Sequence, residues 1–190
     1  MKKIMFNDKF CLTQAVLDGR KRMTRRIISE MIRQSPFAST GWEYVHSGKE
    51  FKPKYKIGEI VAVAQSMHDV CKESDPEFKT IGHLSHCFGA AWSNKMFVES
   101  SRMPHQIKIT NVRVEILQDI SDEDCILEGI HKGKVGNQKH WMDAYYTHKS
   151  SIEPHCKPRE AFASLIDKIS GKSIWESNPQ VCAYEFELIK

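Results

Sequence analysis

Apolar and polar residues alternate most clearly along residues 105–115. Ile107 and Ile109 keep a period of two, which slips by one position near Asn111 before Val112 resumes it. Alternation of this kind predicts a strand with one buried face. The slip predicts a β-bulge at that point, because a bulge places two residues of one strand opposite one of its partner.

Three other segments have the composition of strands. Residues 60–64 form a short apolar run that follows a turn at Gly58, as a buried strand would. Residues 181–189 alternate up to the end of the sequence, and residues 23–28 collect β-branched side chains after a basic stretch. We expect strands over 60–64 and 181–189, and extended chain over 23–28.

Helical signals fall between these strands. Residues 12–19 place apolar side chains on one face and end at Gly19, which suits a left-handed helix stop. Residues 120–130 begin with Ser121 as an N-cap, continue with three acidic residues in the first turn, and close at Gly129. Residues 158–169 start with a proline and carry a stripe of four apolar residues, Phe162, Leu165, Ile166 and Ile169.

A few short strands with helices between them indicate an α+β domain built on a small curved sheet or barrel. The 190 residues, 41% of them hydrophobic, suffice for one good core. The first eight residues lack the apolar run of a signal peptide, and no stretch approaches a transmembrane span. We therefore expect a soluble cytoplasmic protein with no membrane partner, whose six dispersed cysteines are reduced.

The net charge is only +4, so any surface for nucleic acid must be local. Five of the seven residues from 20 to 26 are basic, and no carboxylate lies among them. Such a run attracts a phosphate backbone or another anion, although most short charge runs are solvated turns. The candidate ligand-binding residues of the run are Arg20, Arg22, Arg25 and Arg26.

Four blocks of the sequence, in the order in which they follow one another along the chain, resemble the ASCH domain. They are Gly19-Arg20-Lys21 with Thr24 and Arg25, the turn of residues 55–59, the acidic helix of residues 121–129, and the final strand through residues 184–186. Residues 166–179 also resemble the version found in bacterial and phage-associated ASCH proteins. Together the blocks cover about half of the chain.

The ASCH domain belongs to a PUA-like group of β-barrels that is associated with RNA binding and RNA modification. The resemblance therefore implies an α+β fold with a PUA-like β-barrel, flanking helices and a helix before the first strand. It further implies a single domain over residues 1–190, with loop insertions near residues 29–52, 68–104 and 131–157.

Small bacterial members of the family hydrolyse N4-acetylcytidine with a lysine, a threonine and a glutamate. The matching positions are Lys21, Thr24 and Glu128, which the resemblance implies as catalytic residues without a cofactor. A lysine that burial or neighbouring cations have made less basic can deprotonate a hydroxyl, so Thr24 would attack an acyl carbon. Glu128 would orient the lysine or carry a proton to the leaving amine.

Several departures from those enzymes keep other functions open. The chain is much longer, and Arg22 follows Lys21 where the small hydrolases usually carry threonine. Lys21 and Glu128 would then form a simple ion pair, with Thr24 hydrogen-bonded in a turn. Recognition of RNA or a modified nucleoside in a basic cleft is the leading interpretation, and amide hydrolysis is the alternative. A third is a phage or mobile-element accessory protein that binds other proteins.

Two further groups of residues carry less specific signals. His68, Cys71, His83, His86 and Cys87 are zinc-competent, but their spacing fits no standard finger, so we expect no metal. Aromatic residues in the inserted segments would either stack on unpaired bases or fill the core. For residues 141–146 we favour a short helix that plugs the barrel with two of these side chains; the aromatic set is Trp42, Tyr44, Trp92, Trp141, Tyr145 and Tyr146.

Overall fold

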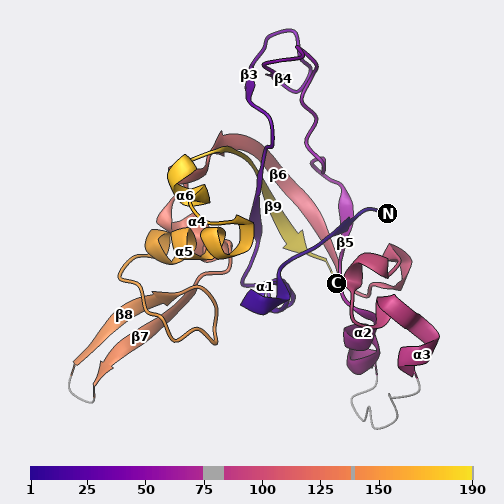
Figure 1. Ribbon diagram of the computed structural model, residues 1–190, viewed down its shortest axis with the longest axis vertical. Helices are drawn as coiled ribbons and strands as arrows, with labels where there is room; N and C mark the ends of the chain where they lie inside the picture. The colour runs from indigo at the N-terminus through magenta and orange to yellow at the C-terminus, as the bar shows by residue number, and fades with distance from the viewer. Residues whose placement is uncertain (75–83, 138–139, 190) are drawn as a thin grey trace.

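A mixed five-stranded sheet forms the centre of the protein in a computed structural model, which describes residues 1–74, 84–137 and 140–189 (Figure 1). The strand order is β1-β5-β6-β9-β2. β1 pairs with β5 in parallel, and the other neighbours are antiparallel. The strands are β1 (Lys3–Ile4), β2 (Met23–Ile27), β5 (Ile60–Val63), β6 (Gln106–Ile116) and β9 (Gln180–Leu188).

The sheet is open, so the prediction of a closed PUA-like barrel is wrong, although the α+β class is correct. Its two edges are β1 and β2, and no strand of the described residues joins them. β1 is only two residues long, and the chain then turns into the 3-10 helix η1 (Asp8–Phe10). A gap separates β1 from β2, and in the described part of the chain no backbone hydrogen bonds of a strand pair cross it. The Arg26 guanidinium instead donates to the Met5 carbonyl across this gap at 2.6 Å.

β6 and β9 are the longest strands, and they pair over most of their length. The register shifts between Ile109 and Asn111, which confirms the bulge predicted from the slip in alternation. β9 is also confirmed as a strand, but residues 181–184 are all buried rather than alternately exposed. β9 lies between β6 and β2, so both of its edges are paired, and Val181, Cys182 and Tyr184 all belong to the core cluster.

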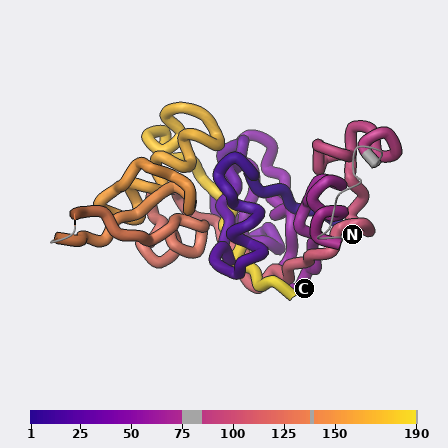
Figure 2. Tube along the Cα trace, turned by 90° about the horizontal axis from the view of Figure 1, so that it is seen from below, coloured from indigo at the N-terminus to yellow at the C-terminus, as the bar shows by residue number. Residues whose placement is uncertain are grey.

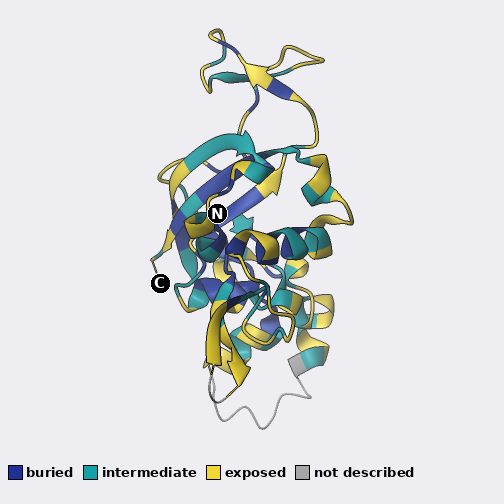
Figure 3. Cartoon of the chain, turned by 90° about the vertical axis from the view of Figure 1, so that its left-hand side faces the viewer, coloured by how far each residue is buried: buried dark blue, intermediate teal, exposed yellow. Residues whose placement is uncertain are grey.

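Helices on one side of the sheet confirm the three helical predictions (Figures 1 and 3). A single cluster of buried side chains joins them to the strands, and α5 contributes Phe162, Leu165 and Ile166 to it. The short strand β1 precedes α1, so the expectation of a helix before the first strand is wrong. The helices are α1 (Leu12–Leu17), α4 (Asp122–Leu127), α5 (Pro158–Ser170) and α6 (Ile174–Ser177), with the 3-10 helix η6 (Leu117–Asp119) before α4.

The three segments expected as insertions project from this centre. Residues 29–52 contain a hairpin of β3 (Ile32–Gln34) and β4 (Trp42–Tyr44), which extends beyond the sheet (Figure 1). The described residues of the 68–104 segment are largely helical and pack a second small core against β5. The helices in and beside that segment are α2 (Met67–Ser74), α3 (Leu84–Phe88), η3 (Gly89–Trp92), η4 (Lys95–Phe97) and η5 (Ser100–Arg102).

Residues 131–157 begin with a second hairpin, formed by β7 (His131–Asn137) and β8 (His140–Tyr146). The short helix predicted over residues 141–146 is therefore wrong. Pairing with β7 satisfies the backbone of this segment as a strand, and Trp141 is 60% exposed rather than buried in a core. Seen from below, this hairpin and α2–α3 lie on opposite sides of α1 (Figure 2).

No helix in the described ranges is long and apolar enough to cross a membrane. All six cysteines are free thiols. Cys125 and Cys182 are buried, and burial raises the pKa of the Cys125 thiol to about 12. These two thiols therefore act as small apolar groups of the core.

The N-cap of α4 should contribute measurably to stability. The Ser121 hydroxyl accepts from the Asp124 backbone N–H at 3.1 Å. Replacing Ser121 with Ala should lower the free energy of unfolding by about 1 kcal/mol, as is typical for a lost cap. Urea unfolding measures the change. Ser121→Asp should keep most of the stability, and an equal loss in both variants would mean that capping is not the cause.

Candidate functional site

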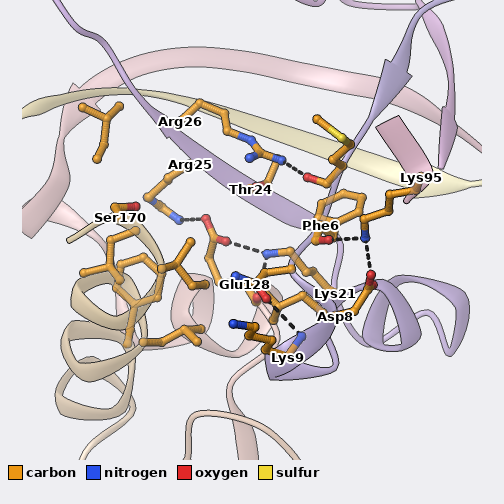
Figure 4. A pocket seen from close by; sticks show the side chains of 18 of the residues that line it. Phe6, Asp8, Lys9, Lys21, Thr24, Arg25, Arg26, Lys95, Glu128 and Ser170 are labelled. Carbon is orange, nitrogen blue, oxygen red and sulfur yellow. Dashed lines mark hydrogen bonds and ion pairs between the residues drawn. The ribbon is translucent and has the colours of Figure 1, made fainter. Parts of the chain in front are cut away.

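A pocket of about 910 Å³ lies between β2 and the helix α5 (Figure 4). One wall is apolar and is formed by α5 through Phe162, Leu165, Ile166 and Ile169. The charged lining holds five cations and two carboxylates, so it carries an excess of positive charge; the cations are Lys9, Lys21, Arg25, Arg26 and Lys95, and the carboxylates are Asp8 and Glu128.

Lys21 reaches this pocket from the turn between α1 and β2. Gly19, with φ of +71°, reverses the chain after the helix. The Arg22 backbone N–H then donates to the Leu127 carbonyl at 2.9 Å, which joins the turn to the end of α4. The Lys21 side chain is only 2% exposed, and its ammonium donates to the Glu128 carboxylate at 2.7 Å and to the Glu128 carbonyl at 2.6 Å.

Glu128 is the C-cap residue of α4 and directly precedes Gly129. Gly129 has φ of +105°, and a Cβ atom there would lie 3.3 Å from Leu12 Cδ2 and 3.5 Å from Lys21 Cδ. A glycine therefore allows the chain to turn while α1 and Lys21 pack closely against it. The sequence signals for the helix and its end, Ser121 and Gly129, also position the buried carboxylate.

Arg25 is the second buried cation at the site, with a side chain that is 1% exposed. Its guanidinium contacts three carboxylates: Glu115 and Asp124 at 2.6 Å each, and Glu128 at 3.2 Å. Burial opposes the charged form, but Glu128 and Glu115 outweigh it and raise the pKa of Arg25. Arg25 thus stabilises the wall of the pocket, and protein carboxylates occupy the donors that the sequence interpretation assigned to a ligand phosphate.

Burial lowers the pKa of the Lys21 ammonium, and the cations Arg26 and Arg25 act in the same direction, while Glu128 partly opposes the shift. The neutral amine is therefore reached at a lower pH than for an exposed lysine. The sequence interpretation expected this direction from neighbouring arginines. Burial is the larger cause.

Thr24 lies on β2 and lines the same pocket as Lys21 and Glu128, so the structure brings all three expected catalytic residues together (Figure 4). Its side chain is buried, with 5% of the residue exposed. Among the described residues, the Thr24 hydroxyl forms no hydrogen bond, and Lys21 donates to Glu128 instead. The Thr24 hydroxyl is thus available to a group that enters the pocket.

The remaining arginines of the basic run separate into two groups. Arg26 lines the pocket, donates to the Met5 carbonyl and lies 5.8 Å from the centre of the Phe6 ring. Arg20 instead pairs with Asp18 at 3.0 Å. Arg22 is exposed and donates to the Gly19 carbonyl at 2.9 Å, and neither Arg20 nor Arg22 lines this pocket.

The N-terminal segment supplies site residues that sequence reasoning missed. Phe6 is buried, and the Lys21 ammonium lies 5.7 Å from the centre of its ring. Asp8 pairs at 2.7 Å with Lys95, which comes from η4, far away in the sequence. No local pattern marks these residues, because β1 and the three-residue 3-10 helix η4 are both too short to show a period.

The possible zinc ligands form no such site where the structure describes them. Among the described residues, no three His, Cys, Asp or Glu side chains are placed to hold a metal ion. His83 lies outside the described residues. His68 contacts Trp92 edge-on, with ring centres 5.4 Å apart.

Comparison with protein-family models, with curated proteins and with solved structures finds no match to this chain.

The buried pair of Lys21 and Glu128 should be strongly coupled. Glu128→Gln leaves the Lys21 ammonium without a carboxylate and should lower the free energy of unfolding by about 3–5 kcal/mol. Lys21→Met should cost less, because Arg25 still pairs with Glu128. Chemical denaturation of the two single variants and the double variant gives the coupling energy.

An exposed ion pair supplies the control for this double-mutant comparison. Lys168 and Glu153 are 2.7 Å apart, with side chains 39% and 63% exposed. Lys168→Met should change the free energy of unfolding by less than about 1 kcal/mol. Additive effects of Lys21→Met and Glu128→Gln would contradict the coupling.

Proposed function

We propose that the pocket between β2 and α5 binds a nucleotide, either free or as one unit of RNA. The observation that carries this proposal is the excess of cations around the pocket, opposite the apolar wall of α5. A nucleotide pairs a charged phosphate with a flat base, so it suits a lining of this composition. A volume of about 910 Å³ is also in the range of small-ligand pockets.

The lining suggests how such a ligand would be held. Arg26 and Lys9 have no carboxylate partner among the described residues, so they would bind the phosphate. The base would lie against the α5 wall. Glu128 would accept from the exocyclic amine of a cytosine-like base, as carboxylates do in base recognition. The sequence resemblance to the ASCH domain supports the same class of ligand.

Arg26 and Arg22 form a matched pair for a test. Both are exposed arginines of the same basic run, but only Arg26 lines the pocket. Arg26→Ala should weaken the binding of cytidine monophosphate about tenfold, because one charge-assisted contact to phosphate is lost. Arg22→Ala should leave the affinity unchanged. Isothermal titration calorimetry at a fixed salt concentration measures both.

Two results would contradict the proposal. One is the absence of binding to any of the four common ribonucleoside monophosphates by the folded wild-type protein. The other is an equal loss in Arg22→Ala and Arg26→Ala, which would indicate non-specific attraction to the basic run rather than binding in the pocket.

A second candidate function is hydrolysis of an amide such as the N4-acyl group of a modified cytidine. The observation that favours it is the Thr24 hydroxyl in the same pocket as Lys21, whose pKa is lowered. Neutral Lys21 would take the Thr24 proton while the Thr24 oxygen adds to the acyl carbon. The C–N bond then breaks, Lys21 returns the proton to the departing amine, and water hydrolyses the acyl-threonine.

Hydrolysis through these residues predicts a specific dependence on pH. The reaction needs neutral Lys21, so the rate should rise with pH and level off below 10.5, the ordinary lysine value, because the pKa of Lys21 is lowered. Thr24→Val should remove turnover of N4-acetylcytidine while keeping the volume of the side chain. Release of cytidine, followed by liquid chromatography, measures both. Turnover that survives in Thr24→Val would exclude threonine as the nucleophile.

A further inference from the structure

A second pocket of about 320 Å³ adjoins the first at the free edge of β2. Met5, Arg26 and Ile27 line both pockets, so the two share one boundary. The far side of the second pocket comes from residues 44–55, which include the end of the β3–β4 hairpin. The two pockets thus meet at Met5 and Arg26, whose hydrogen bond spans the gap between β1 and β2.

Positive charge dominates this second pocket. Its lining contains Lys3, Arg26, Lys52 and Lys54 and no carboxylate. Lys3 is already engaged, since its ammonium donates to three backbone carbonyls, and Lys52 lies 3.5 Å from Glu50.

Arg26 and Lys54 have no carboxylate partner among the described residues. Arg26 uses one donor on the Met5 carbonyl, and the Lys54 ammonium lies 5.5 Å from the centre of the Tyr55 ring, so neither charge is neutralised by an acidic side chain. Arg26 stands at the shared boundary, and Lys54 stands on the far side. An anion that enters between the two pockets therefore meets two unneutralised cations.

Four aromatic residues also line the second pocket: Tyr44, Phe51, Tyr55 and Tyr184. Tyr55 and Tyr184 meet edge to face at 5.3 Å, and Tyr44 meets Phe51 in the same way at 5.7 Å. The Tyr55 hydroxyl donates to the Lys3 carbonyl, and the Tyr184 hydroxyl accepts from the Lys54 backbone N–H, so both rings are held in place. Phe51, Tyr55 and Tyr184 are buried in the core, whereas Tyr44 is half-buried, so Tyr44 offers an aromatic surface beside the cations of the pocket. An aromatic surface beside cations suits an unpaired base next to a phosphate.

We propose that the second pocket takes the nucleotide adjacent to the one in the first pocket, and that Arg26 holds the phosphate that joins them. The inference rests on the proposed function and extends it: the ligand is single-stranded RNA of at least two nucleotides rather than a free nucleotide. A single strand is required, because two neighbouring bases must leave any stack or pair to occupy separate pockets.

The test compares a mononucleotide with a dinucleotide. Wild-type protein should bind the 5′-phosphorylated dinucleotide pCpC at least about tenfold more tightly than cytidine monophosphate, since a further phosphate contact and a stacked base are added. Lys54→Ala should remove most of that gain and leave the affinity for cytidine monophosphate unchanged. The slope of log affinity against log salt for pCpC should also fall by about 0.7 in Lys54→Ala.

Lys56→Ala is the matched control, because Lys56 is an exposed lysine two residues away that lines neither pocket. It should bind both ligands as the wild type does. Lys54 is itself exposed, so its replacement should not affect folding.

Each outcome separates this inference from the proposed function. If pCpC binds no more tightly than cytidine monophosphate, the second subsite is wrong while the mononucleotide site stands. An equal loss of affinity for cytidine monophosphate and pCpC in Lys54→Ala would also contradict the second subsite. So would a tetraglutamate peptide that binds the wild-type protein as tightly as pCpC does. If neither cytidine monophosphate nor pCpC binds, both proposals fail.

Discussion

The buried contact between Lys21 and Glu128 is the interaction on which the rest of the site depends. Both side chains are almost entirely removed from water, so each charge needs a close partner. The partner of Lys21 comes from the end of α4, which is why the turn after α1 must meet that helix. Arg25 extends the network to β6 through Glu115, and the three elements are thereby held in one arrangement.

The open sheet leaves room for this site. A closed barrel would pair β1 with β2 and fill the gap with a backbone ladder, whereas here the chain leaves β1 after two residues. Phe6 and the Arg26 contact to the Met5 carbonyl bridge the gap with side chains instead. Met5 and Arg26 line both pockets, so both pockets lie beside this gap.

The cations that line the two pockets differ in whether a carboxylate of the protein neutralises them. Those that are neutralised form a structural set, and those that are not form an available set. Lys21 and Arg25 belong to the first, because protein carboxylates neutralise them inside the wall. Arg26 and Lys54 belong to the second, because no carboxylate of the described residues pairs with them. The neighbouring basic residues of the run therefore differ, because carboxylates of the protein neutralise Lys21 and Arg25 but not Arg26.

Local sequence patterns predicted most of the helices and strands, and they also predicted the helix end that carries Glu128. Alternation located β6 and its bulge, and the cap at Ser121 with the stop at Gly129 located α4 and thereby Glu128. These signals depend on neighbouring residues, so the sequence by itself contains them. The open edges of the sheet and the roles of Phe6, Asp8 and Lys95 depend on segments distant in the chain. Only the tertiary structure decided these features, because the partner that pairs with or neutralises each group lies far away in the sequence.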